Sequence, residues 1–291
     1  MPRTGGPGTK SIAQTASLTA GRLSSGLRML PGFLIVGGQR CGTTSMYRAL
    51  AQHPLIQKPI WHKGVHYFDL HYDRGLGWYR AHFPLRAGAG RMERAWGRPP
   101  LAFESSPYYM HHPLAPGRIA HDLPGVKLIV LVRDPVERAH SAHAHELARG
   151  FEDEPFERAL ALEPQRLERE EDRMRADPAY RSHALQHQAY VTRGQYADQL
   201  DRLAALVGRE RLLVLDSGAF FSEPEAEYSR VLAFLELPRC GTTVFERHNA
   251  RPRPHVPDAT RQRLSAHFEP YDARLEPWLA GVPSWRRRPV V

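Results

Sequence analysis

The sequence is poor in cysteine and has no long apolar segment. Its two cysteines, Cys41 and Cys240, are too few for a disulfide framework or a four-thiolate zinc site, although they leave a single disulfide open. No apolar run reaches the ~18 residues of a transmembrane helix, and residues 1–30 lack the compact apolar segment of a secretory signal peptide. These absences predict a cytoplasmic protein without a membrane span.

Acidic residues are fewer than basic ones, and the excess charge lies at the two ends of the chain. Forty Lys and Arg against 31 Asp and Glu give the 291 residues a formal net charge of +9. Residues 1–30 carry no acid, and three consecutive arginines occupy 286–288. The nearly neutral body between them argues against a nucleic-acid partner, but it leaves room for a local pocket that binds a small polyanion.

We expect three regions along the chain: a disordered basic tail at 1–30, one domain at 31–282, and a basic C-terminal tail at 283–291. The first region is rich in Arg, Ser, Thr and Gly, so an organellar transit peptide is the alternative interpretation. No repeat and no composition shift divides the central region, which predicts a single domain.

Short apolar runs alternate with helical patterns in this central region. Runs with β-branched residues predict strands at 33–37, 127–132 and 211–215, with weaker ones at 65–68 and 101–103. Apolar spacing predicts helices at 44–53, 135–149, 155–163, 179–207 with a break at Gly194, 223–236 and 258–279. The highly charged segment 163–178 is expected to be a solvated insertion or helix. This alternation predicts an α/β fold, a P-loop-type parallel sheet with helices on both faces.

A glycine-rich turn follows the first predicted strand, with the sequence Gly-Gly-Gln-Arg-Cys-Gly-Thr-Thr at 37–44. It fits the phosphate-binding template G-x-x-x-x-G-K-[ST], except that Thr43 replaces the lysine. Backbone N–H groups of such a loop bind an anion whatever its side chains are, whereas an NTP hydrolase also needs the lysine and a metal. Arg40 is the cation here, and its planar fork suits phosphate or sulfate. A plain helix N-cap at Thr43 or Thr44 is the structural alternative.

The strand at 127–132 runs directly into Arg133 and Asp134. We expect Arg133 to bind a second anion and Ser141, two turns into the next helix, to donate its hydroxyl to the same group. A surface ion pair is the alternative for Arg133. Asp134 stands where a Walker-B acid would follow its strand, so a P-loop nucleotide kinase or NTPase is the alternative function.

Together these motifs resemble those of the sulfotransferases that use 3'-phosphoadenosine 5'-phosphosulfate (PAPS), closest to the heparan sulfate and carbohydrate branch and its bacterial relatives. The resemblance spans about residues 32–280. Four parts carry it: the loop 37–45 for the 5'-phosphosulfate, the element 128–141 for the 3'-phosphate, the acceptor-side segments 65–69 and 75–79, and the loop 249–254 that closes over the nucleotide.

The resemblance implies sulfuryl transfer from PAPS to a hydroxyl or amine of an acceptor, with no metal. A carbohydrate acceptor is favoured, and a glycosylated or small metabolite stays open; no oligomeric state follows. The residues implied for donor binding are Gly38, Gln39, Arg40, Cys41, Gly42, Thr43, Thr44, Ser45, Arg133, Ser141 and Arg251.

Three positions depart from the pattern of the family. Arg40 stands in place of a loop lysine, Gly64 in place of a general-base glutamate, and Ser105 in place of a second lysine. We expect Arg40 to neutralise charge on the leaving phosphate without donating a proton. Because Gly64 lacks the carboxylate and Ser105 lacks the ammonium of the family pattern, a further alternative is an anion-binding protein with reduced catalysis.

His66 is the expected general base, because the unperturbed pKa of histidine, ~6.5, suits proton removal at neutral pH. We expect Asp69 to orient it, and Glu104 is the rival base. A half-buried histidine with a satisfied hydrogen bond is the structural alternative for His66, and a simple cap is the alternative for Asp69. His140 and His143 share a helix face, but no Cys or carboxylate at ligand spacing completes a metal site.

Overall fold

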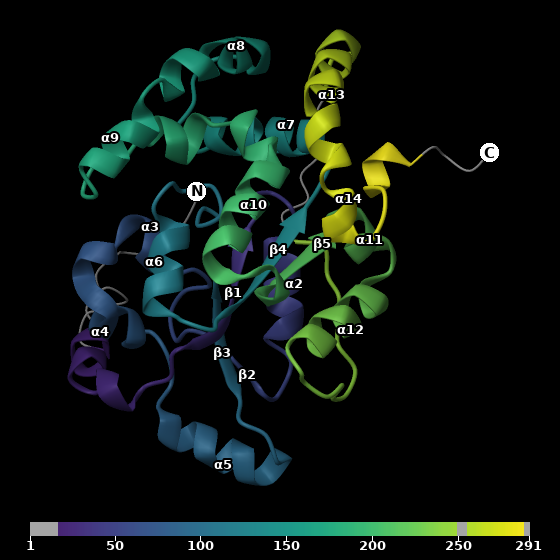
Figure 1. Cartoon of the computed structure of the whole chain (residues 1–291). Coiled ribbons are helices and arrows are strands. Elements are labelled where there is room, and N and C mark those ends of the chain that lie inside the picture. Colours follow the sequence, from purple (N-terminus) through teal and green to yellow (C-terminus); the bar gives the residue numbers. More distant parts are fainter. Residues whose placement is uncertain (1–16, 249–254, 288–291) are drawn as a thin grey trace, which may run out of the picture.

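The computed structural model describes residues 17–248 and 255–287, and in this range a five-stranded parallel sheet forms the centre of one α/β domain (Figure 1). The strand order is β2-β3-β1-β4-β5. The strands are β1 (Pro31–Gly37), β2 (Ile56–Gln57), β3 (Leu101–Ser105), β4 (Lys127–Val132) and β5 (Leu212–Asp216). Because every pairing is parallel, the carboxyl ends of the strands meet at one edge of the sheet.

Helices cover both faces of this sheet, with α10 in front of it and α2 behind it in Figure 1. Their bounds are α2 (Thr43–Leu50), α3 (Tyr67–Leu70), α4 (Gly75–Arg80), α5 (Arg86–Trp96), α6 (Ala115–Asp122), α7 (Pro135–Leu147), α8 (Phe156–Leu167), α9 (Glu170–Ala176), α10 (Tyr196–Val207), α11 (Ser217–Ser222), α12 (Pro224–Phe234), α13 (Asp258–Ala273) and α14 (Glu276–Leu279). The predicted fold class is confirmed. Among the described residues, no helix combines the length and apolarity needed to cross a bilayer.

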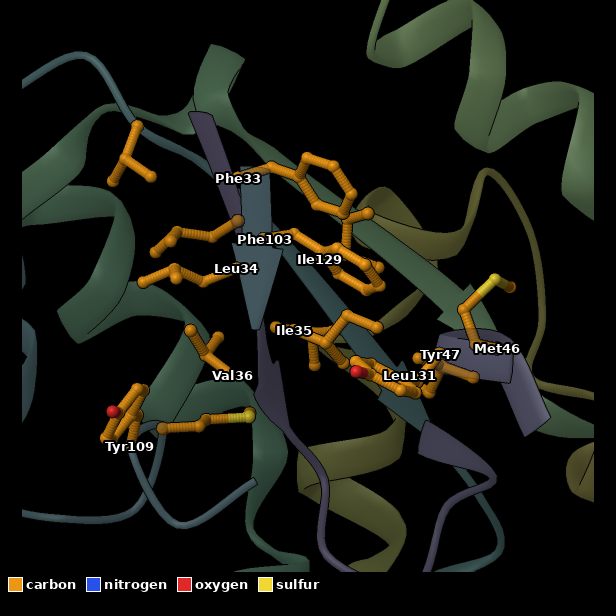
Figure 2. Packing of buried hydrophobic residues seen from close by; sticks show 14 of the residues in the cluster. Phe33, Leu34, Ile35, Val36, Met46, Tyr47, Phe103, Tyr109, Ile129 and Leu131 are labelled. Carbon is orange, nitrogen blue, oxygen red and sulfur yellow. The ribbon is translucent and has the colours of Figure 1, made fainter. Parts of the chain in front are cut away.

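The core is built on β1, which is fully buried along its apolar residues. Successive side chains of a strand point to opposite faces. Figure 2 shows Phe33 and Ile35 on the side of α2, and Leu34 and Val36 on the other side. Phe33 stacks on Phe103 of β3 with ring centroids 4.9 Å apart. A central strand that is apolar on both faces explains why the sequence shows a continuous apolar run there.

The predicted strands at 33–37, 101–103, 127–132 and 211–215 are confirmed as β1, β3, β4 and β5 within two residues. The predicted strand at 65–68 is wrong, because Tyr67–Leu70 form the helix α3. Tyr67 stacks on Tyr79 of α4 at 4.7 Å between ring centroids. Aromatic burial against α4 therefore replaces strand pairing in this segment. The short strand β2 is absent from the prediction.

The predicted helices at 44–53, 135–149 and 155–163 correspond to α2, α7 and α8. The expected helix at 179–207 is divided into a π-helix (Ala184–Gln188), a 3-10 turn (Thr192–Gly194) and α10, and the break falls at Gly194. The patterns at 223–236 and 258–279 correspond to α12 and to α13 with α14. The charged segment at 163–178 forms the end of α8 and the whole of α9.

The domain extends further than the predicted bounds. Residues 17–23 form a helix, and the Arg28 guanidinium donates to the carbonyl of Phe83 at 2.7 Å. Ser284–Arg286 form a 3-10 turn that is bonded to the domain. The expectation of a disordered tail is therefore wrong for residues 17–30, and the expected C-terminal tail begins too early. The remainder of both expected tails lies outside the described residues.

The central position of β1 predicts a large cost for truncating it. Ile35→Ala removes three buried carbons from a side chain with no exposed surface, so the free energy of unfolding should fall by about 2–5 kcal/mol. Urea denaturation followed by circular dichroism measures this loss. Leu206→Ala on α10 is the control, since its side chain is 48% exposed and the cost should stay near ~0.5 kcal/mol. Equal losses in the two variants would contradict the assignment of the core.

Candidate active site

A cavity of about 380 Å³ opens at the carboxyl edge of the sheet, where β1 and β4 end. Six of the residues predicted to bind the donor line it, although they come from segments about 100 residues apart. They are Arg40, Gly42, Thr43, Thr44, Arg133 and Ser141. The two anion-binding motifs of the sequence are thus brought into one pocket, which we call the donor pocket.

The loop between β1 and α2 is shaped by left-handed backbone at two positions. Gly42 has φ +88°, and a Cβ atom there would lie 3.1 Å from the ring of Phe221. Arg40 also has a positive φ of 69°, which costs about 1 kcal/mol for a side chain of this kind. The turn lets α2 start at Thr43, so the unpaired N–H groups of its first turn face the pocket.

Arg40 reaches across the donor pocket to α7. Its Nε–H donates to the hydroxyl of Ser141 at 3.0 Å. The Arg133 side chain is 31% exposed, and its Nη2 lies 3.7 Å from the Oε2 of Glu137 on α7. Asp134 caps α7 by accepting from two of its backbone N–H groups, so its carboxylate serves the helix. The guanidinium of Arg40 therefore lies on the α7 side of the pocket.

Four loop residues use their side chains elsewhere or have none. Gln39 donates to Glu146 at 3.3 Å, and the Ser45 hydroxyl accepts from the N–H of His248. Cys41 is fully buried, and burial raises the pKa of its thiol. The N–H of Gly38 donates to Leu131 of β4, and the N–H of Cys41 donates to the Gly38 carbonyl at 3.2 Å, so neither of these two groups points to a donor. Arg251 lies outside the described residues.

Residues near the C-terminus also line the donor pocket, and the sequence analysis missed them. Ser284 and Trp285 are part of its wall. The Ser284 N–H donates to Asp216 at 2.7 Å, and the Trp285 indole N–H donates to Asp272 at 3.0 Å. The basic composition of 283–291 hid this role, because only the long-range bonds to the two aspartates reveal it.

A second cavity of about 520 Å³ lies beside α3 and α4. We call it the histidine cavity, since four imidazoles line it: His62, His66, His71 and His82. Trp78 of α4 forms part of its wall, whereas Tyr79, Tyr108 and Tyr109 are buried and line neither cavity.

His66 and Asp69 form the pair that the sequence analysis anticipates. The His66 Nδ1 lies 2.8 Å from Asp69 Oδ2, and the Asp69 side chain has no exposed surface. A carboxylate only accepts hydrogen bonds, so Nδ1 carries the hydrogen and Nε2 is left as the acceptor of the neutral ring. His66 has φ +55°, a left-handed conformation that places it as the N-cap of α3. Strain of this kind occurs at functional sites.

The pKa of His66 is raised above its ordinary value. Burial of the ring lowers the pKa, but the hydrogen bond to Asp69, the charge of Asp69 and the charge of Glu104 outweigh that effect. A base whose pKa lies above that of free histidine removes a proton more strongly, at the cost of being protonated at higher pH.

Glu104, the rival base, is placed where it cannot meet an acceptor. It is fully buried at the end of β3 and lines neither cavity. Its carboxylate accepts from the hydroxyls of Tyr109 and Ser106, both at 2.7 Å, and from the N–H of Val65 at 3.1 Å. Burial raises its pKa. The geometry makes Glu104 a positioning residue that fixes the segment before α3.

Gly64 stands in van der Waals contact with the end of β3. A Cβ atom at this position would lie 2.6 Å from the carbonyl oxygen of Ser105 and 2.9 Å from the hydroxyl of Ser106. A backbone carbonyl cannot move aside as a flexible side chain can. In this chain the position is therefore closed to a glutamate, and a base must come from elsewhere.

Comparison with known proteins agrees with this geometry. A sulfotransferase domain model matches residues 30–250. The chain belongs to the sulfotransferase family. Members of the family use PAPS as sulfuryl donor, and the kinase interpretation finds no support. Within the described ranges, no three His, Cys, Asp or Glu side chains are placed to hold a metal ion.

Three similar proteins illustrate the relationship. Heparan sulfate glucosamine 3-O-sulfotransferase 6 of Mus musculus is 31% identical over 280 residues, which cover 86% of this chain and 72% of that protein. Bifunctional heparan sulfate N-deacetylase/N-sulfotransferase 3 of Homo sapiens is 28% identical, over 89% of this chain and 31% of that protein. A sulfotransferase crystal structure from Alicyclobacillus acidocaldarius is 29% identical with a TM-score of 0.63, covering 89% of this chain and all of that chain.

The donor pocket of this sulfotransferase suits PAPS. The molecule carries anionic groups on both the 5' and the 3' oxygens of its ribose. The pocket offers the first N–H groups of α2, the hydroxyls of Thr43 and Thr44, and the guanidinium groups of three lining arginines, Arg40, Arg133 and Arg247. Such donors bind phosphate and sulfate without a metal. Arg40 and Arg133 are the residues that would hold the two anionic ends.

Arg133→Ala should weaken the binding of adenosine 3',5'-bisphosphate, the desulfated donor, by ~10–100-fold, because a charge-assisted hydrogen bond to phosphate is lost. Isothermal titration calorimetry in buffer with EDTA measures the affinity. Arg263→Ala on α13 is the control, since this arginine is exposed and outside the pocket. Unchanged affinity in Arg133→Ala, or binding that appears only with Mg-ATP, contradicts the assignment of the pocket.

Proposed function

We propose that this sulfotransferase moves the sulfuryl group of PAPS to a hydroxyl or amine of a carbohydrate, with His66 as general base. The observation that carries the proposal is the His66–Asp69 pair, held at 2.8 Å in a cavity separate from the donor pocket. The names of the relatives, heparan sulfate sulfotransferases, support a carbohydrate acceptor. The aromatic face of Trp78 in the cavity wall is a surface on which a sugar ring can pack.

The residues divide the work between donor and acceptor. PAPS supplies an activated sulfuryl group when bound. Asp69 accepts from Nδ1–H of His66, which aims Nε2 at the cavity and stabilises the imidazolium that forms when an acceptor loses its proton. Arg40 and the N–H groups of α2 neutralise charge that develops on the leaving 5'-phosphate. This arrangement positions charges and one base, which is what an in-line group transfer requires.

The acceptor class is tested with radiolabelled PAPS, an N-sulfated heparan oligosaccharide and 4-nitrophenol as a non-sugar alcohol, all in EDTA. We expect label on the oligosaccharide. His66→Asn should lower kcat by about 100-fold or more and leave the affinity for adenosine 3',5'-bisphosphate unchanged. His121→Asn is a matched control, because it breaks a His–Asp contact of 2.7 Å outside both cavities. Label on 4-nitrophenol alone would overturn the carbohydrate proposal, and full activity of His66→Asn would overturn the base.

The pH profile distinguishes a base from a structural histidine. In the wild type, kcat/KM should fall as the pH drops through the raised pKa of His66, because the protonated ring cannot accept a proton. Asp69→Asn removes the charge that raises this pKa, so the acidic limb should move to lower pH while kcat decreases. Rates measured between pH 5 and 9 show the limb. A lower kcat with an unmoved limb would mean that Asp69 serves only the local fold.

A further inference from the structure

Lys63 lies at the start of the phosphate loop's helix, although the sequence places it in another part of the chain. Its ammonium donates to the hydroxyls of Thr43 at 3.1 Å and Thr44 at 3.0 Å. Its backbone carbonyl accepts from the N–H of Ser105 at 3.0 Å, which holds the segment against the end of β3. The position of Lys63 is thus set at both its backbone and its side chain.

This lysine stands between the two cavities. Thr43 and Thr44, whose hydroxyls Lys63 contacts, line the donor pocket, whereas His62 and Gly64, the chain neighbours of Lys63, line the histidine cavity. A group that passes from a donor in the first cavity to an acceptor in the second must cross this boundary. Lys63 is half-buried there, so its charge acts with little screening by water.

Arg40 does not fill the same place. Its Nε–H is bonded to Ser141 on α7, whereas Lys63 contacts the start of α2. The loop position that a lysine occupies in the phosphate-binding template holds Thr43, and the Thr43 hydroxyl is one of the two that Lys63 contacts. The ammonium missing from the loop sequence is therefore present at the loop in space, supplied by a residue 20 positions further along the chain.

We propose that Lys63 is the catalytic cation of the transfer step, which contacts the sulfuryl oxygens and the leaving 5'-phosphate oxygen of PAPS. The inference rests on the proposed function. As the acceptor oxygen or nitrogen bonds to sulfur, the bond from sulfur to the 5'-phosphate oxygen breaks. The electron pair stays on that phosphate oxygen, the acceptor proton passes to His66, and Lys63 keeps its protons while it donates hydrogen bonds.

The charged groups around Lys63 set the pH range in which it can act. Burial lowers its pKa to about 8, and the charge of Glu104 on β3 opposes this shift. His66 lies on the acceptor side, and its charged form interacts with Lys63. The ring centroid of Tyr47 on α2 lies 6.0 Å from the Lys63 Nζ. Burial, followed by the charge of Glu104, raises the pKa of Tyr47 to about 12. With a pKa of about 8, Lys63 loses its proton between pH 7 and 9.5, and the Lys63 variants separate its titration from that of His66.

Three variants test the inference: Lys63→Met removes the charge, Lys63→Arg keeps it at all pH values, and Lys58→Met is a control at an exposed lysine of the same segment. We expect Lys63→Met to lower kcat by ~100-fold. Lys63→Arg should recover part of that loss, and Lys58→Met should match the wild type. Thermal melts confirm that each variant is folded.

Calorimetry with adenosine 3',5'-bisphosphate gives a readout apart from turnover. Wild-type affinity should fall ~10-fold between pH 7 and 9.5 as Lys63 loses its proton. Lys63→Met should bind ~10-fold more weakly at pH 7 with a flat profile, and Lys63→Arg should bind tightly with a flat profile. If Lys63→Met binds adenosine 3',5'-bisphosphate with the same affinity and the same pH dependence as the wild type, the inference is overturned even if turnover falls.

The same measurements separate the two proposals. Turnover by the wild type with unchanged kcat in Lys63→Met overturns the role of Lys63 and leaves the sulfotransferase function standing. Absence of sulfuryl transfer by the wild type, with every acceptor class supplied, overturns the proposed function and the inference with it. A lower kcat in Lys63→Met, together with a weaker affinity that no longer changes with pH, supports both the proposed function and the role of Lys63.

Discussion

The close packing of Gly64 on the end of β3 is the constraint on which the rest of the site depends. With no side chain, Gly64 approaches the Ser105 carbonyl to a distance that any Cβ would violate. On one side of this contact, Lys63 is directed to the hydroxyls of the phosphate loop. On the other, His66 takes up the left-handed conformation that starts α3. One backbone contact therefore sets the donor side and the acceptor side at a fixed separation.

Buried polar groups support the phosphate loop from behind. Gln39 is held between Glu146 and the guanidinium of Arg193, and Glu146 also accepts from His187 at 2.9 Å. Burial tends to raise the pKa of Glu146, but the hydrogen bond and charge of His187 lower it overall. A network in which each member has a partner is rigid, because breaking one bond leaves a buried charge unpaired. This rigidity holds the loop in its anion-binding shape before any donor arrives.

The elements that were predictable are those whose signal is local. The buried strands at β1, β4 and β5 show as continuous apolar runs, since each is covered on both faces. The pocket residues Arg40 and Arg133 follow directly from the ends of two such strands, and parallel strands end at one edge of the sheet. The strand expected at 65–68 failed because its aromatic residues are buried by packing on α4, which sequence periodicity does not record.

The amino-acid order alone determined the class of fold, the anion-binding loop and the pairing of His66 with Asp69, because each depends on neighbours within a few residues or on the general rule for parallel sheets. The tertiary structure alone decided that Lys63 supplies an ammonium at Thr43 and Thr44, that Glu104 is sealed from both cavities, and that Ser284 and Trp285 complete the donor pocket. These contacts join segments that are distant in sequence, and their formation follows from the free energy of packing the whole domain.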